Sequence, residues 1–196
     1  MGRGWAWRTA ALAAPLLVLL TACQATPESR LYTLAPVTPA PAPAGTSPQR
    51  LALGSIDLPL LIDRPQIIRR IDGNRVETLE FDRWAEPLAD GLRSTLAADL
   101  TARLPGTTVL PVSGTTVGEG TVVLTTTILR FEADAAGRVV LETQWSLGAA
   151  GDGRKSGPSH DTVEAMAGST EPDALVRAMS QALAAFADRV AAAVRR

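Results

Sequence analysis

Cysteine, histidine and aromatic residues are scarce in this sequence. Its 196 residues include one cysteine and one histidine, and aromatic residues make up only 4%. A single cysteine excludes an intramolecular disulfide, and a single histidine excludes most zinc sites and most histidine-based catalytic arrangements. Neither sign of charge is in excess, because the formal net charge at pH 7 is −1, which argues against nucleic acid as a partner. We therefore expect no metal site, no catalytic residues and no cofactor.

The only cysteine, Cys23, follows a short apolar run near the N-terminus. Arg3 and Arg8 lie before or at the edge of that run, which covers residues 10–20 and is shorter than the roughly 20 apolar residues that a membrane-spanning helix needs. A basic start, a short apolar core and small residues before a break are typical of a secretory signal peptide. The sequence therefore predicts a signal peptide over residues 1–22.

Leu20-Thr21-Ala22-Cys23 resembles the lipobox of bacterial lipoproteins, in which a diacylglyceryl group is attached to the cysteine sulfur. The alternative is a plain signal peptide followed by a free cysteine, but an unpaired thiol is a liability in an oxidising compartment. We interpret Cys23 as a lipidation site, and its covalent lipid as the only attached group. Gln24 stands where an aspartate would retain such a lipoprotein in the inner membrane, which indicates the outer membrane.

Residues 35–50 read APVTPAPAPAGTSPQR, with five prolines and almost no large apolar side chain. We interpret this stretch as a semi-rigid, polyproline-type spacer that adds reach and no stability to the fold. The predicted division is a signal peptide at 1–22, a lipidated N-terminus and linker at 23–50, and one folded domain at 51–196. A chain of this length supports one domain with a substantial core.

The predicted domain combines strands with two helices. Leucines recur every four residues from Leu88 to Leu104, which is typical of a core-facing helix. A second helix is expected to open at Thr170, a candidate cap, with Pro172 in its first turn. Strands are expected at 51–58, 66–71, 76–81, 109–112, 121–132, 139–147 and 160–167. This order predicts an α+β fold, with a mostly antiparallel sheet and the two helices packed on one face.

Two stretches of the domain are the most distinctive, residues 58–70 (LPLLIDRPQIIRR) and residues 81–88 (FDRWAEPL). In the first, prolines bracket Asp63-Arg64, and we expect them to stiffen the loop and hold the guanidinium outward. Trp84 in the second stretch is either a core aromatic that fastens the helix start to the sheet or a contact with a protein partner. We favour the core for Trp84 and the partner contact for Arg64.

These motifs, with the lipobox, the proline-rich spacer and a tryptophan in a late strand (Trp145), resemble those of the ABC-type transport auxiliary lipoproteins of the PqiC/YmbA type. The resemblance extends from Leu31 to the last helix. The family gives no catalytic residue to transfer, so the matching residues are only candidate partner contacts. They are Pro59, Asp63, Arg64, Pro65, Gln66, Trp84, Glu86 and Pro87.

The resemblance implies a non-enzymatic lipoprotein at the periplasmic face of the outer membrane of a Gram-negative bacterium. Its partners would be a mammalian-cell-entry (MCE) domain protein and the associated ABC transporter, in a system that moves lipids or other hydrophobic molecules across the periplasm and supports envelope integrity. It would dock or gate the outer-membrane end of the conduit, as a monomer or a homo-oligomer. Two alternatives stay open: an assembly or pilot lipoprotein for an outer-membrane β-barrel or secretin, and a periplasmic lipid-binding carrier.

Overall fold

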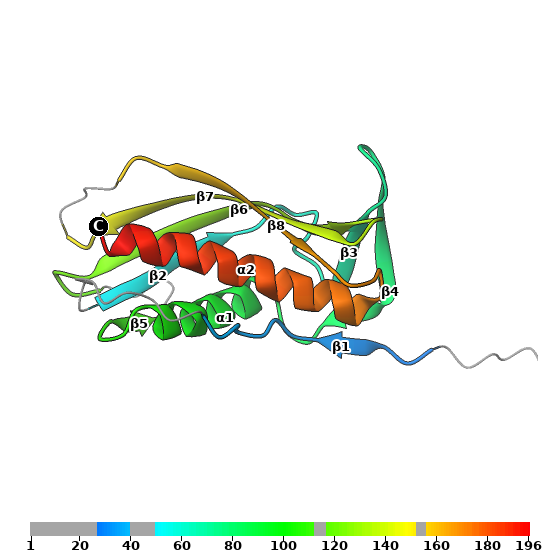
Figure 1. Cartoon of the computed structure of the whole chain (residues 1–196), viewed down its shortest axis with the longest axis horizontal. Coiled ribbons are helices and arrows are strands. Elements are labelled where there is room, and N and C mark those ends of the chain that lie inside the picture. The colour runs from blue at the N-terminus through cyan, green and yellow to red at the C-terminus, as the bar shows by residue number, and fades with distance from the viewer. Residues whose placement is uncertain (1–26, 40–49, 112–116, 152–155) are drawn as a thin grey trace, which may run out of the picture.

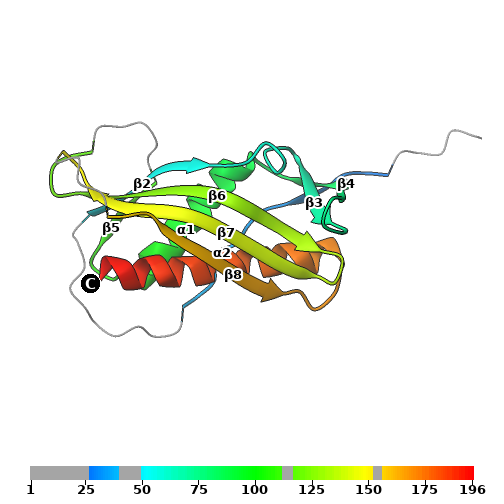
Figure 2. The same ribbon diagram turned by 90° about the horizontal axis from the view of Figure 1, so that it is seen from above.

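Two helices cover one face of a single eight-stranded sheet in the computed structural model, which describes residues 27–39, 50–111, 117–151 and 156–196 (Figures 1 and 2). The elements are β1 (Arg30–Tyr32), β2 (Arg50–Asp57), β3 (Gln66–Arg70), β4 (Val76–Trp84), α1 (Leu88–Arg103), β5 (Thr108–Leu110), β6 (Val122–Asp134), β7 (Arg138–Ala149), β8 (Ser159–Met166) and α2 (Pro172–Val194). This arrangement confirms the predicted α+β fold with helices on one face.

The long strand β6 organises the sheet. One edge of β6 pairs with β7, and the other is shared by β2 and, at its last two residues, by β3. The long β6–β7 and β7–β8 ladders and the β3–β4 hairpin are antiparallel, whereas β1–β4, β2–β5, β2–β6 and β3–β6 are parallel. The sheet is therefore mixed. The sequence revealed only the antiparallel part, because hairpin signals mark neighbours along the chain and parallel partners are separated by long crossovers.

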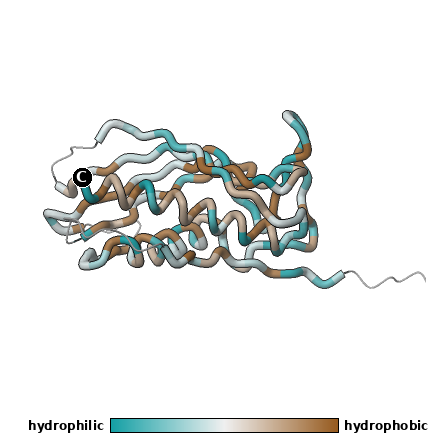
Figure 3. The backbone as a smooth tube through the Cα atoms, in the orientation of Figure 1, coloured by the Kyte–Doolittle hydropathy of each residue, from teal (hydrophilic) through white to brown (hydrophobic). Residues whose placement is uncertain are grey.

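The core lies between the sheet and the two helices. All five leucines of the predicted stripe, from Leu88 to Leu104, are at most 3% exposed, and their spacing places them on one face of α1. In β7 the side chains of Val139, Leu141 and Trp145 point the same way, as the period of two requires. Hydrophobic segments recur along both helices and the neighbouring strands (Figure 3). Packing of these faces holds the two layers together.

Most predicted strands differ from the structure by one or two residues at an end, and two further differences concern α2 and β4. Helix α2 has Glu171 rather than Thr170 at its N-cap, with no side-chain cap bond, although Pro172 occupies the first turn as expected. Strand β4 continues to Trp84 instead of ending at residue 81. Its last three residues stay in the sheet because they pair with β1.

Residues 30–37, which include the first residues of the predicted spacer, pack on the domain, which differs from the predicted division at residues 50 and 51. Leu34 is only 8% exposed and belongs to the core. The backbone N–H of Ala35 donates to Ser180 Oγ at 3.2 Å, and that of Val37 donates to Asp99 Oδ1 at 2.9 Å. The folded unit therefore begins at β1, before the predicted spacer. Residues 40–49 of that spacer lie outside the described residues.

A buried ion pair joins this segment to both helices. Arg103 is 3% exposed; its guanidinium lies 3.1 Å from Asp99 Oδ1 and 2.7 Å from Asp188 Oδ1, and it donates to the Val37 carbonyl at 3.2 Å. Burial raises the pKa of Asp99, and the hydrogen bond from Val37 and the charge of Arg103 oppose that shift. The N-terminal segment is thus fastened by polar bonds as well as by Leu34.

Candidate functional site

One short hydrogen bond brings the two distinctive stretches of the sequence together. The backbone N–H of Trp84 donates to the Pro65 carbonyl at 2.7 Å, and Gln66 lies opposite Arg83 in the β3–β4 register. Between Gln66 and Ile67 the register shifts, so β4 bulges at this point. A bulge bends its strand and redirects side chains. The loop before β3 and the turn before α1 are therefore held side by side.

A groove of about 360 Å³ opens between this loop and this turn. Six of the eight candidate contacts line it, together with Ala85 and Leu88. These six are Asp63, Arg64, Pro65, Trp84, Glu86 and Pro87. We call this site the Trp84 groove. Residues that the sequence separates by about twenty positions thus form one surface.

The Trp84 groove has an apolar floor and a charged rim. Trp84 and Leu88 are 8% and 3% exposed and belong to the core, which confirms the core interpretation of Trp84. The three charged residues of the rim, Asp63, Arg64 and Glu86, are exposed. None of their side chains forms a hydrogen bond or ion pair with the described residues. Apolar surface ringed by unpaired charges suits recognition of another protein.

Local structure explains why the rim charges face outward. The Pro59 carbonyl accepts the N–H groups of Ile62 and Asp63 at 3.0 and 3.2 Å, and the Ile62 side chain is 4% exposed. This turn anchors the loop through Ile62 and leaves Asp63 and Arg64 outside. On the opposite rim, a Cβ atom placed at Gly91 would lie 3.5 Å from Glu86 Oε1. The Glu86 carboxylate therefore lies over the first turn of α1, where the helix dipole favours a negative charge.

Two candidate contacts lie elsewhere. Gln66 begins β3 and is only partly exposed. Pro59 lines a separate depression of about 180 Å³, with Leu61, Leu129 and the polar residues Arg70, Arg130, Glu132 and Glu142. The structure therefore does not bring Pro59 and Gln66 to the Trp84 groove. Their place in the motif reflects the turn and strand that support the loop.

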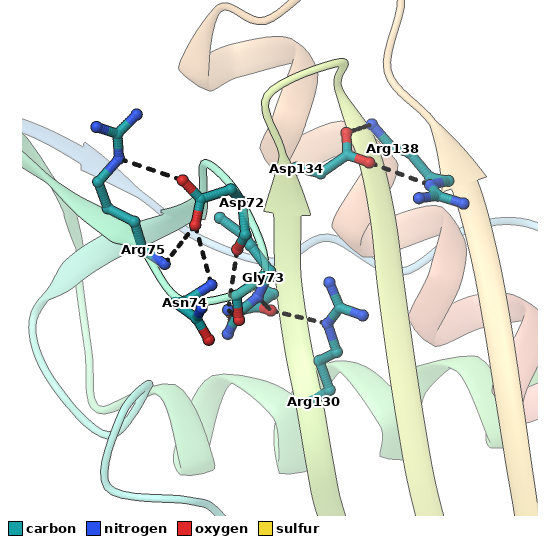
Figure 4. A network of polar contacts seen from close by, with 9 residues as sticks. Asp72, Gly73, Asn74, Arg75, Arg130, Asp134 and Arg138 are labelled. Carbon is teal, nitrogen blue, oxygen red and sulfur yellow. Dashed lines mark hydrogen bonds and ion pairs between the residues drawn. The ribbon is translucent and has the colours of Figure 1, made fainter.

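Three of the charges beside Pro59 are paired with one another. Glu132 is 1% exposed; Arg130 Nε lies 2.7 Å from Glu132 Oε1, and Arg70 bonds the same carboxylate, which raises the pKa of Arg70. Arg70 also reaches the carbonyls of Asp72 and Gly73. These two residues belong to the β3–β4 turn, which is labelled in Figure 4. The cluster fastens that hairpin to β6. The described residues contain no cluster of potential metal ligands.

A third buried acid, Asp82, lies two residues before Trp84, and its link to β1 was not anticipated from the sequence. Asp82 is 6% exposed; it accepts the Tyr32 hydroxyl at 2.9 Å and lies 2.8 Å from Arg30 Nε. Burial, together with the bond to Asp82, raises the pKa of Tyr32 to about 12. The only local signal for this link is the stretch Leu31-Tyr32-Thr33-Leu34, which is too short to show the period of a strand.

Solved structures share this fold. An uncharacterized protein matches with a TM-score of 0.73 and 20% identity, over 86% of this chain and 99% of its own. A Xanthomonas campestris protein of the DUF330 family matches with a TM-score of 0.69 and 23% identity, over 85% of this chain and 95% of its own. No significant match is found among curated proteins. These similarities define the class of the fold: an α+β domain of the kind present in both structures.

The family follows from the sequence match. The model of the ABC-type transport auxiliary lipoprotein component covers residues 32–191, so the chain belongs to that family. This confirms the resemblance seen in the two motifs. It also makes the protein a lipoprotein-type auxiliary component of a transport system, anchored at a membrane. Within the described residues, neither helix has the length and hydropathy needed to cross a bilayer. Cys23 lies outside the described residues.

Proposed function

We propose that the protein is acylated at Cys23, resides at the periplasmic face of the outer membrane, and docks a transport complex through the Trp84 groove. Its partners would be an MCE-domain protein and the associated ABC transporter, which move lipids or other hydrophobic molecules across the periplasm. In this role the protein is non-catalytic and needs no cofactor besides its covalent lipid. ATP hydrolysis would take place in another subunit.

The observation that carries this proposal is the convergence of the two family motifs. Six motif residues from two separate segments line one groove. The rim charges make no bond within the described part of the domain, so they contribute little to its stability. Charges that are exposed, unpaired and held by a well-packed floor are available to a partner of complementary charge. Family membership supplies the kind of partner, a component of a transport system.

Charge reversal at Arg64 tests the docking surface. Arg64→Glu should weaken capture of a purified MCE-domain partner and leave the thermal melt unchanged, because the guanidinium forms no bond within the described residues. Loss of a rim charge mainly lowers the association rate and its salt dependence. Surface plasmon resonance at two salt concentrations measures both.

A matched control uses an arginine outside the Trp84 groove. Arg177 is also exposed, lies on α2, and has no hydrogen bond or ion pair within the described residues. Arg177→Glu changes the net charge equally and should leave capture intact. Equal losses for both variants would attribute the effect to net charge and remove the Trp84 groove from the docking surface. Unfolding of the Arg64→Glu variant would also remove the Trp84 groove from the docking surface, because Arg64 would then be needed for the fold.

A further inference from the structure

The docking of the N-terminal segment leaves a short connection to the lipid. Only residues 24–29 separate Cys23 from Arg30, the first residue of β1. Even fully extended, the chain from Cys23 to Arg30 spans at most about 25 Å. The proline-rich residues 40–49 cannot lengthen this connection, because they follow a segment that is already bonded to α1 and α2. The distance between domain and membrane is therefore set by residues 24–29.

This connection leaves the domain at one defined end. Residues 27–29 and β1 lie at the end of the molecule opposite the C-terminus and β5 (Figures 1 and 2). Helix α2 runs along the long axis, and its 23 residues measure about 35 Å. A lipid on Cys23 would therefore bring the β1 end of the domain to the bilayer. The β5 end lies about the length of α2 from the β1 end, which is more than the roughly 25 Å that the connection spans.

Exposed apolar side chains lie where the connection leaves the domain. Leu31 is 66% exposed and Phe81 is 38% exposed. Leu31 lies opposite Arg83 in the parallel β1–β4 register, and Phe81 precedes Arg83 by two residues. Strand β4 bulges at this point, and the consecutive residues Glu80 and Phe81 are both exposed. Leu31 and Phe81 are thus exposed apolar side chains on the two paired strands β1 and β4 at this edge of the sheet.

We propose that the short connection holds this edge of the sheet against the bilayer, with Leu31 and Phe81 in the interfacial region of the lipid. This inference rests on acylation at Cys23, which is part of the proposed function. Two apolar side chains bind a lipid surface only weakly by themselves. Anchoring within about 25 Å raises the effective concentration of these two side chains at the lipid surface. Their contact with the lipid therefore needs little affinity of its own. The domain then has a fixed orientation on the membrane.

The test uses the full-length, acylated protein in vesicles of phosphatidylethanolamine and phosphatidylglycerol. The thioether on Cys23 consumes the only native thiol, so a cysteine introduced elsewhere can be labelled selectively. An environment-sensitive fluorophore is placed at Leu31→Cys, at Phe81→Cys and, as control, at Thr108→Cys, an exposed position on β5. Lipids that carry a spin label in the upper acyl chain should quench the first two labels and leave the third unchanged.

The outcomes separate this inference from the proposed function. Acylated, vesicle-bound protein whose labels at residues 31 and 81 escape quenching would overturn the inference and leave the anchor standing. Equal quenching at residues 31 and 108 would also overturn it, since the domain would then have no preferred orientation. Protein that carries no lipid by mass spectrometry and does not float with vesicles would overturn both. Shielding from an aqueous quencher only after the MCE-domain partner is added would assign the edge to that partner instead.

A pair of insertions tests the role of the connection itself. A flexible Gly-Ser insertion between Glu28 and Ser29 should reduce quenching at residue 31, because a longer connection lowers the effective concentration of the edge at the lipid. The same insertion between Ala44 and Gly45 should leave quenching unchanged. The reverse pattern would show that the proline-rich segment sets the distance to the membrane, and quenching that neither insertion alters would remove the short connection as the cause.

Discussion

Trp84 contacts two environments with one side chain. It belongs to the hydrophobic core at 8% exposure, and it lines the floor of the Trp84 groove. Its backbone N–H also holds the loop that carries Arg64, through the bond to the Pro65 carbonyl. The residue therefore supports the rim charges by fixing the surface beneath them. A change at Trp84 acts on binding through the stability and shape of the domain.

Truncation of this side chain should therefore cost stability first. Trp84→Ala is expected to lower the free energy of unfolding by about 3–5 kcal/mol, as large aromatic truncations in cores usually do. Denaturant titration followed by circular dichroism measures the loss, and Trp84→Phe should recover much of it. A loss below about 1 kcal/mol together with failed partner capture would instead make Trp84 a direct contact.

Asp134 gives the domain a pH-dependent bond at the β6–β7 turn. Burial alone would raise its pKa, but hydrogen bonds from the backbone and side chain of Arg138 and from the Ala136 N–H outweigh burial and lower it below the ordinary value of 3.8. Asp134 and Arg138 are drawn in Figure 4. A carboxyl group with a lowered pKa stabilises the fold above its ordinary value, and this contribution is lost as the pH falls through the folded-state pKa.

Asp134→Asn isolates this charge, because the amide oxygen can still accept the backbone N–H groups. At pH 7 the variant should be less stable by about 1 kcal/mol, the scale of one partly exposed charged bond. The gap should close when the pH is well below 3.8. Chemical denaturation at both pH values checks it, and a gap that is constant with pH would mean that shape rather than charge is lost.

At the scale of elements, the segment from Arg30 to Val37 is the part of the domain that the sequence conceals. Leu34 contributes one buried apolar side chain to a stretch that otherwise reads as spacer. Leu34→Ala should lower the free energy of unfolding by about 2–5 kcal/mol, whereas Leu31→Ala, at an exposed position, should stay within about 0.5 kcal/mol. Melting both variants side by side checks the pair. If Leu34→Ala leaves the free energy of unfolding unchanged, the segment is part of the linker and not of the folded domain.

Elements with a local signal could be predicted from the sequence. The leucines of α1 and the alternation in β7 follow the periods of a helix and a strand, and both elements lie where those patterns place them. Strand β1 could not be recognised in this way, because three residues are too few for a period. Its existence depends on partners some fifty residues later. The parallel pairings of β2 with β5 and β6 could not be predicted either, because these partners are also distant in the sequence.

The candidate site shows the same limit. The motif residues themselves are visible in the sequence, and Arg64 is outside and Trp84 inside as expected. Their convergence depends on the bond between Trp84 and Pro65 and on the bulge in β4, and neither leaves a trace in composition or spacing. The separation of Pro59 from the Trp84 groove likewise depends on the folded structure and not on the spacing of the motif. Motif membership alone does not distinguish a residue that lines a site from one that supports it.

At the scale of the whole molecule, the lipid proposed on Cys23 would decide where the domain works. Cys23→Ala should leave a precursor that is unprocessed or released, because the acyl chains provide the hydrophobic anchor. Labelling cells with radioactive palmitate, followed by membrane fractionation, checks this expectation. Wild type should incorporate label and fractionate with the outer membrane. Equal label in Cys23→Ala would place the lipid elsewhere or exclude it.

The position of β1 also has a consequence for the order of events during export. A chain that crosses the inner membrane with its N-terminus first delivers residues 30–37 long before their partners. The bond from Val37 cannot form before Asp99 has crossed, and the bond from Ala35 cannot form before Ser180 in the last helix has crossed. Contacts so distant in sequence form late in folding. The N-terminal segment would therefore remain unpaired while most of the chain is still in transit. If Cys23 is acylated as proposed, this interval would leave it accessible to the enzymes of lipid attachment and cleavage before folding closes residues 30–37 onto the helices.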